Sequence, residues 1–457
     1  MGLVQLFGVV IAVFSVVTAD SGYFWHVTDF HYDPTYWGQQ LSCNDVVPTP
    51  GVYGDYWCDS PWVLVQDSIE NMGRIRRDVD FVIWTGDNVA HISDTYMSLN
   101  INLAILQNIT TALNKTFPGV PFYPSLGNHD FYPSDQASGS VSEMYLRMSE
   151  IWADWIVDPQ QIELFKKGGY YTKLIRPKLR LLALNTVLYM EGDHVTTNLT
   201  DPAGQFQWID AVLAGSRSAG EKVIITGHVP PTLVVPSLLN WFQLRFHARF
   251  INLLTSYSDI ILAHHYGHDH SDSFRILQRD DGMGATPVFI APSITPWRYR
   301  IPTETGEPHN PGIRLVEYDR DTGRHLNYRQ FFINVTDSNR RNATQWEELY
   351  NFQTAFGVPD MSLGSLKAIY KSMDTVDSSH MKQCCNYLLV TNLTQDCTDA
   401  VQAGIWCGGQ MQEESAAKIC VNEYVHKKKR TLFLADWVDR LLAQIVQLFS
   451  NFWSKDN

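Results

Sequence analysis

The chain has 457 residues, 45% of them hydrophobic, which is enough to bury one large core with a smaller subdomain, or two domains. Its net charge of −13 argues against a nucleic-acid polymer as the main partner, because such polymers require clustered Lys and Arg. Small phosphorylated ligands remain compatible with this charge, since a metal ion can supply local positive charge.

The first 19 residues are predicted to be a secretory signal peptide. An uncharged apolar run from Leu3 to Val17 is too short to span a membrane, and the small residues Thr18 and Ala19 follow it. Export is also indicated by six Asn-x-Ser/Thr glycosylation sequons. These are at Asn108, Asn114, Asn198, Asn334, Asn342 and Asn392. We expect a secreted, extracellular protein, with lysosomal or peripheral membrane locations as alternatives.

The seven cysteines fit the same oxidising compartment. Cys43 and Cys58 bracket a short Pro- and Gly-rich loop, and five more lie between Cys384 and Cys420. We predict that they form disulfides that staple loops. The odd number leaves one free thiol, which we expect to be Cys384 or Cys385.

From Tyr23 to about Phe332, short apolar runs alternate with patterns of helical spacing. The runs predict strands at Tyr23–Val27, Phe81–Trp84, Phe122–Leu126, Leu181–Leu184, Val223–Thr226 and Ile260–Ala263. The patterns between them predict helices over Thr95–Thr116, Gln205–Ala214 and Trp241–Thr255. After His270, antiparallel strands are predicted at Ser273–Leu277, Pro287–Ala291, Ile313–Tyr318 and Tyr328–Ile333. The predicted class is α/β, with a mixed sheet sandwich flanked by helices.

Beyond about Asn334 the predicted strands stop. Helices are expected over Ala343–Phe356, Ser362–Asp374 and Asp377–Leu389, before the cysteine-rich stretch. The domain prediction is therefore a signal peptide (1–19), a catalytic domain (20–333), a helical disulfide-stapled subdomain (334–426) and a tail (427–457). The tail begins with four basic residues, Lys427–Arg430, and continues as an amphipathic helix that either docks on the enzyme or lies on a membrane surface.

Side chains of metal-ligand type directly follow five of the predicted strands. They are Asp29, His31, Asp87, Asn128, His228, His268 and His270. Strand ends of an open α/β sheet meet at one edge, where sites form, and four of the five signals have a neighbouring Gly that permits a sharp turn. His and carboxylate ligands suit zinc, iron or manganese.

Spacing suggests how these ligands are shared. Residues two apart in an extended segment point the same way, so Asp29 can share a metal with His31. By the same reasoning His268 and His270 both face the site, while Asp269 turns away. Asp87 is the natural bridging carboxylate of a two-metal site.

These motifs, in this order, resemble those of the calcineurin-like metallophosphoesterases. Longer matches resemble the acid sphingomyelinase group, and most of all its acid sphingomyelinase-like phosphodiesterases. The matching segments are Asp29–Tyr36, Cys58–Trp62, Trp84–Asp87, Gly127–Pro133, Leu184–Tyr189, Gly227–Pro231 and Asn310–Arg314. The resemblance covers about residues 22–425 and implies the two-sheet metallophosphoesterase sandwich.

The resemblance also implies roles for individual residues. One zinc ion would be held by Asp29, His31, Asp87 and His270, and a second by Asp87, Asn128, His228 and His268. His91 and His129 match the two histidines that contact the scissile phosphate. His129, hydrogen-bonded to Asp130 or a nearby carbonyl, would be the general acid. The family pattern further implies a Cys407–Cys420 disulfide, whereas Cys397 lacks its usual partner and is expected to pair with Cys384 or Cys385.

The implied function is that of a secreted dinuclear zinc phosphodiesterase, in which a hydroxide shared by the metals attacks phosphorus. The expected substrates are small phosphodiesters or pyrophosphates such as nucleotides and nucleotide conjugates. We expect no counterpart of the lipid-extracting saposin domain of acid sphingomyelinase before Tyr23. Hydrolysis of sphingomyelin or another phospholipid at a membrane is the alternative. A non-catalytic membrane-associated regulator is a third hypothesis, which the completeness of the ligand set disfavours.

Overall fold

The computed structural model describes residues 20–279, 281–298, 300–301, 304–375, 378–393 and 397–431. The predicted signal peptide and the part of the tail beyond Thr431, with its predicted amphipathic helix, lie outside these residues. Within the described ranges, no helix combines the length and the apolar character needed to cross a membrane.

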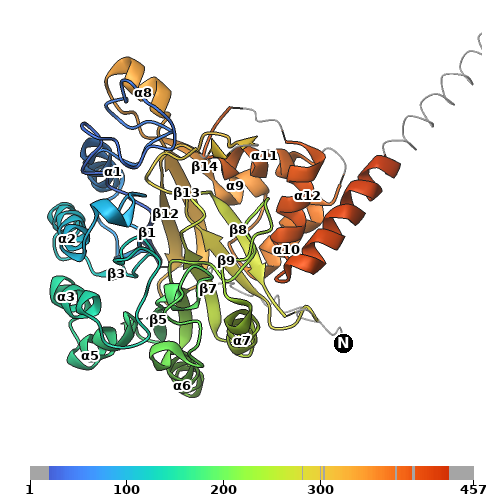
Figure 1. Ribbon diagram of the computed structural model, residues 1–457. Helices are drawn as coiled ribbons and strands as arrows, with labels where there is room; N and C mark the ends of the chain where they lie inside the picture. The colour runs from blue at the N-terminus through green and yellow to red at the C-terminus, as the bar shows by residue number, and fades with distance from the viewer. Residues whose placement is uncertain are drawn as a thin grey trace, which may run out of the picture.

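Two six-stranded mixed sheets form the centre of the molecule (Figure 1). The first has the order β14-β13-β12-β1-β2-β3 and the second the order β4-β5-β6-β7-β9-β8. The strands of the first are β1 (Ser21–Val27), β2 (Phe81–Trp84), β3 (Phe122–Pro124), β12 (Gly312–Asp319), β13 (His325–Phe332) and β14 (Glu347–Asn351). Those of the second are β4 (Tyr171–Arg176), β5 (Leu179–Ala183), β6 (Lys222–Thr226), β7 (Ile261–Tyr266), β8 (Ser273–Leu277) and β9 (Thr286–Ile290). A separate hairpin joins β10 (Arg300–Ile301) to β11 (Glu304–Thr305).

The two sheets share one continuous apolar core. The ring of Phe24 on β1 meets that of His265 on β7 with centroids 5.5 Å apart, so inner faces of the two sheets are in contact. Strands β1, β2 and β3 are parallel to one another, and so are β5, β6, β7 and β9. The carboxyl ends of each parallel set therefore open at a common edge. This arrangement confirms the predicted sandwich.

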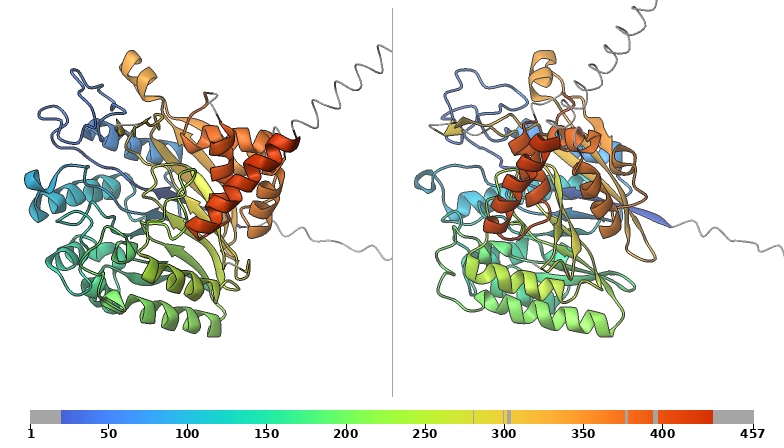
Figure 2. Two further views of the ribbon diagram at one scale, coloured as in Figure 1. Left: turned by 45° about the vertical axis from the view of Figure 1, so that its right-hand side comes forward. Right: turned by 90° about the vertical axis from the view of Figure 1, so that its right-hand side faces the viewer.

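Helices cover the sandwich on its outer sides (Figures 1 and 2). Those between the strands are α1 (Trp62–Ile75), α2 (Leu99–Thr116), α3 (Glu143–Ile151), α4 (Ala153–Ile156), α5 (Pro159–Gly168), α6 (Gln205–Ser218) and α7 (Leu244–Thr255). Short 3₁₀ turns are η1 (Asp94–Tyr96), η2 (Thr186–Tyr189) and η3 (Pro202–Gly204). Local sequence explains α2 well, because Ser98 caps its start by accepting from the Ile101 N–H and its buried residues recur at helical spacing.

The C-terminal helices are α8 (Val335–Arg341), α9 (Phe352–Phe356), α10 (Leu363–Met373), α11 (Ser379–Leu388) and α12 (Asp399–Gly408), and residues 414–431 are also helical. Helices α10 and α11 contact β8 at the edge of the second sheet. In Figure 1 they stand on the opposite side of the sheets from α1 and α2. The basic run is partly used for docking here, since Lys427 pairs with Asp374 and Lys428 with Asp399.

The prediction of one helix over Ala343–Phe356 is wrong. Residues 347–351 form β14, which pairs with β13, and only Phe352–Phe356 is helical. Sheet pairing overrides helical spacing because Tyr350 becomes buried, and its hydroxyl donates to Asp272 at 2.7 Å. Asn351 then ends the strand and caps α9 by accepting from the Thr354 N–H. The first sheet thus extends past residue 333, and the four-part domain division stays a prediction.

Three disulfides join Cys43 to Cys58, Cys385 to Cys397 and Cys407 to Cys420, and Cys384 is free. The pairing predicted from the family pattern is confirmed, and the choice left open for Cys397 is decided in favour of Cys385. Five of the six sequon asparagines are exposed. Asn334 is half-buried and caps α8. Their glycosylation stays a prediction.

Candidate dimetal site

The seven predicted ligands meet at the carboxyl ends of the parallel strands. Their His and Asp atoms fall into overlapping groups in which all ligand atoms lie within 4.8 Å of one another. The groups are His31, His91 and His270; Asp87, His228 and His268; and Asp29, His31 and Asp87. His268 is half-buried, and the other six predicted ligands are buried.

Most of these ligands have a left-handed backbone. The φ angle is 53° at Asp29, 39° at His31, 56° at Asp87, 69° at His268 and 56° at His270. The expectation of extended segments at 29–31 and 268–270 is therefore wrong, although both side chains of each pair do face the site. Non-glycine residues rarely adopt this conformation, and it persists only where the surroundings enforce it, as at functional sites.

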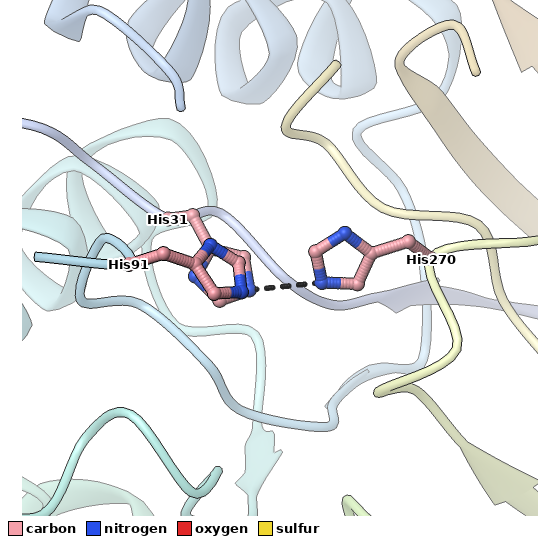
Figure 3. A group of neighbouring side chains, drawn as sticks. All are labelled: His31, His91 and His270. Atoms are coloured by element: carbon pink, nitrogen blue, oxygen red, sulfur yellow. Dashed lines mark hydrogen bonds between the residues drawn. The ribbon is translucent and has the colours of Figure 1, made fainter. Parts of the chain in front are cut away.

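The ligands predicted for the first metal are centred on His31, and we call them the first group. Its Nε2 lies 3.1 Å from His270 Nε2 and 3.6 Å from Asp29 Oδ1, and the latter two atoms are 3.4 Å apart. Figure 3 shows His270 facing His31 and His91 from the opposite side of the site. Bonds of about 2.0–2.2 Å to zinc place neighbouring tetrahedral ligands about 3.4 Å apart. The observed separations therefore fit one shared cation.

The second group is centred on His228. Its Nε2 lies 3.1 Å from Asp87 Oδ2 and 2.9 Å from Asn128 Oδ1. His268 contributes Nδ1 at 3.2 Å from the same nitrogen. Because Asp87 Oδ2 is also 3.5 Å from His31 Nε2, this carboxylate stands between the two groups. That is the position predicted for a bridging ligand.

Hydrogen bonds to groups outside the ligand set orient these ligands. His31 and His228 each direct Nδ1 to a backbone carbonyl, of Val89 at 2.8 Å and of Thr85 at 2.7 Å, which leaves the Nε2 lone pairs for a metal. The Asn128 amide donates its Nδ2–H to Asp135 Oδ1 at 2.8 Å, so its oxygen faces His228.

The backbone of Gly127 passes very close to the side chain of Asp87. A Cβ on Gly127 would lie 2.1 Å from Asp87 Oδ1, so this position requires glycine.

The charge balance of the chain on its own also favours cations. Burial raises the pKa of Asp87, but His228, His129 and His31 overcome this and hold it far below its ordinary value. Burial lowers the pKa values of His31 and His228, yet the neighbouring carboxylates raise both to about 9. Buried carboxylates thus draw positive charge to the points where cations would sit. One buried ligand atom, Asp29 Oδ1, lacks a hydrogen-bond partner.

His91 and His129 lie beside these groups with ring centroids 4.3 Å apart. Asp59 fixes His91, accepting from its backbone N–H at 2.6 Å and facing its Nδ1 at 3.0 Å. Burial would raise the pKa of Asp59, but His91 lowers it to about 2.

The partner predicted for His129 is wrong. Its Nδ1 meets the Ser134 hydroxyl at 3.0 Å, whereas the Asp130 carboxylate accepts backbone N–H groups from Gly127 and Asn88.

Asp269 turns away from the other predicted ligands, as expected. Its carboxylate forms a buried ion pair with Arg275 and accepts from the Trp241 Nε1–H at 2.8 Å. Arg275 therefore neutralises the negative charge that Asp269 brings near His268. Trp241 is held with its ring 4.6 Å from that of His268.

Comparisons with known proteins agree with this geometry. A family model for calcineurin-like phosphoesterases matches residues 22–272, and one for the acid sphingomyelin phosphodiesterase C-terminal region matches residues 284–427. Acid sphingomyelinase-like phosphodiesterase 3b of Homo sapiens is 33% identical over 416 residues, 88% of this chain and 90% of that protein. The chain belongs to the acid sphingomyelinase-like phosphodiesterase family.

Two further relatives carry activity names. Cyclic GMP-AMP phosphodiesterase SMPDL3A of Homo sapiens is 33% identical over 383 residues, 81% of this chain and 83% of that protein. Sphingomyelinase phosphodiesterase C of Dictyostelium discoideum is 33% identical over 393 residues, 82% and 87% respectively. This chain is accordingly a phosphodiesterase hydrolase with a dimetal centre.

Several residues of this phosphodiesterase site were not found from the sequence. Asp59 lies inside the family motif Cys58–Trp62, which could have drawn attention to it. Ser134 and Asp135 directly follow the motif that ends at Pro133, but no local pattern marks them as partners of His129 and Asn128.

Proposed function

We propose that this protein is an exported dinuclear zinc phosphodiesterase that hydrolyses phosphodiester and pyrophosphate bonds of small substrates such as nucleotides and nucleotide conjugates. The observation that supports this most is the pair of ligand groups sharing Asp87, with His91 and His129 beside them. Three disulfides among the described residues and five exposed sequon asparagines support export.

The first zinc would be held by Asp29, His31, Asp87 and His270, and the second by Asp87, Asn128, His228 and His268. His91 also lies within reach of the first group, but its side chain is 23% exposed, against 6% for His270 and 0% for Asp29. We therefore assign His91 to the phosphate and the buried carboxylate of Asp29 to the first metal. The His, Asn and carboxylate donors, with no thiolate, are compatible with zinc.

When bound, the zinc ions would polarise the phosphoryl oxygens and supply an ionised water as nucleophile. His91, with Nδ1 held by Asp59, directs Nε2 at an oxygen of the phosphate and stabilises its developing charge. His129, with Nδ1 held by Ser134, presents Nε2 to the leaving oxygen as general acid. Burial and the nearby His91 lower the pKa of His129, and the negative charge of a bound phosphodiester acts in the opposite direction.

Nucleotides are the favoured substrates, since one relative is named as a cyclic GMP-AMP phosphodiesterase. A second candidate, hydrolysis of sphingomyelin or another phospholipid, is favoured by the relative named as a sphingomyelinase. Association of tail 427–457 with a membrane surface would serve this second activity.

A substrate panel with the purified full-length protein, at acidic and neutral pH, tests the proposal. It contains ATP, CDP-choline, a cyclic dinucleotide and sphingomyelin, with EDTA-treated enzyme and zinc add-back as controls. We expect zinc-dependent cleavage of at least one nucleotide substrate, and loss of that activity in D87N. Cleavage of sphingomyelin alone would refute the nucleotide assignment, and activity that survives EDTA would refute the dimetal mechanism.

A further inference from the structure

A tryptophan adjoins the phosphate side of the site. Trp297 is half-buried, and its ring centroid lies 4.7 Å from that of His91 and 4.9 Å from that of His270. An indole therefore borders both the histidine assigned to the phosphate and a histidine of the first metal group. Neither the predicted ligand set nor the mechanism uses this ring.

Hydrogen bonds fix the backbone of the segment that carries Trp297. Its N–H donates to the His309 carbonyl at 3.2 Å, and the His309 N–H donates back to the Trp297 carbonyl at 2.8 Å. Two residues earlier, the Thr295 N–H donates to the Asp29 carbonyl at 3.0 Å. His309 also directs Nδ1 to the His270 carbonyl at 3.3 Å. The backbone of the segment is thus fastened to both ligand loops, which reduces the ordering that a ligand must impose when it binds beside the indole.

Two charged residues lie close to this part of the site, Arg298 and Asp59. The next residue is Arg298, whose guanidinium lies over the Trp57 ring at 5.0 Å and whose Nε donates to the Gly306 carbonyl. Asp59, the carboxylate beside His91, is already paired with that histidine. Neither Arg298 nor the paired Asp59 offers a free negative charge to a quaternary ammonium, and a cationic Arg298 is compatible with an aromatic group attached to an anionic phosphate.

We propose that the indole of Trp297 is the platform on which the base of a nucleotide substrate stacks while its phosphate lies against His91 and the dimetal centre. This assignment rests on the proposed function and adds to it a specificity-determining residue. Stacking of a base on an aromatic side chain tolerates every base, because each has a π-face. The enzyme would then select nucleotides over other phosphate esters without reading one particular base.

Binding measurements on the zinc-loaded full-length protein test this assignment. The ligands are AMP, ribose 5-phosphate and phosphocholine, of which the first two share the same sugar phosphate. We expect W297A to weaken AMP by about 10-fold, as for loss of one base–aromatic stack, and to leave the other two unchanged. W297F should keep most of the AMP affinity. The control is W208A, which removes a half-buried Trp that packs on Tyr170 in another part of the fold.

Each other outcome overturns the assignment. Unchanged AMP affinity in W297A would show that no base stacks there. A selective loss of phosphocholine would show that the ring binds a quaternary ammonium instead. Equal loss of AMP and ribose 5-phosphate would show that Trp297 only supports His91 and His270. Failure of the proposed function is a separate result, in which the wild-type protein leaves every nucleotide in the substrate panel intact.

Discussion

Three buried histidines form a hydrogen-bonded chain between the two sheets, apart from the metal ligands. His265 directs Nδ1 to His26 Nδ1 at 3.3 Å and Nε2 to His325 Nε2 at 2.9 Å, and His26 continues to the Thr85 hydroxyl. When each ring carries one proton, every hydrogen bond of the chain has one donor and one acceptor. A second proton on any ring places a positive charge in a dry core, which burial disfavours. We therefore predict that this chain makes the protein sensitive to acid.

His325 gives the magnitude of this effect. Burial lowers its pKa from the ordinary 6.5 to about 4, and its side chain is only 3% exposed. Because the folded state binds this proton more weakly than the unfolded state, the stabilisation is complete above pH 6.5 and is lost as the pH falls toward 4. A pKa difference of this size corresponds to about 3 kcal/mol of unfolding free energy in full. About 2 kcal/mol of this stabilisation is lost between pH 7 and pH 5. Arg314 further disfavours protons on His26 and His265.

The variant H325Q removes this titration and keeps a hydrogen-bonding side chain. We expect its free energy of unfolding to fall by about 2 kcal/mol less between pH 7 and pH 5 than that of the wild type. Urea titrations of the zinc-loaded proteins at pH 7, 6 and 5 measure this difference, and the comparison cancels the contribution of the metal site. H194Q, at an exposed histidine, is the control. If the free energy of unfolding fell equally with pH in the wild type and in H325Q, the reasoning would be refuted.

Further predictions concern the site and its supports. S134A should reduce kcat by about 10-fold for a substrate with a poor leaving group and much less for 4-nitrophenyl esters. The reason is that it removes the hydrogen-bond partner of His129 Nδ1. Equal losses on both substrates would argue against a role of Ser134 in positioning the general acid. R275M should destabilise the fold by about 3–5 kcal/mol in urea titrations, since it leaves the buried Asp269 charge unpaired, and the double variant R275M/D269N should recover much of this. Removing metal with EDTA should lower the thermal midpoint, and zinc should restore it, because the ligands bind the ion only when folded.

The sequence by itself determined much of the catalytic half. Apolar runs and the polar residues that end them are local signals, so the strands before Asp29, Asp87 and His228 could be predicted within one or two residues. The parallel arrangement of those strands then required their ends to meet at one edge. Asp87 could be proposed as the bridging ligand, because one short carboxylate can hold two cations. The resemblance to a family added His91 and His129, which no local pattern distinguishes from ordinary polar residues.

Only the tertiary structure decided the features that depend on distant partners. β14 is a strand because β13 offers it an edge, although its own spacing favours a helix. Cys384 and Cys385 are neighbours in sequence, but successive residues of a helix point in different directions, so packing of α11 directs only Cys385 to Cys397. Trp297 reaches His91 and His270 only because its segment is hydrogen-bonded to both ligand loops. Local spacing encodes which face of an element is buried, whereas the neighbour on that face is set by the packing of the whole chain.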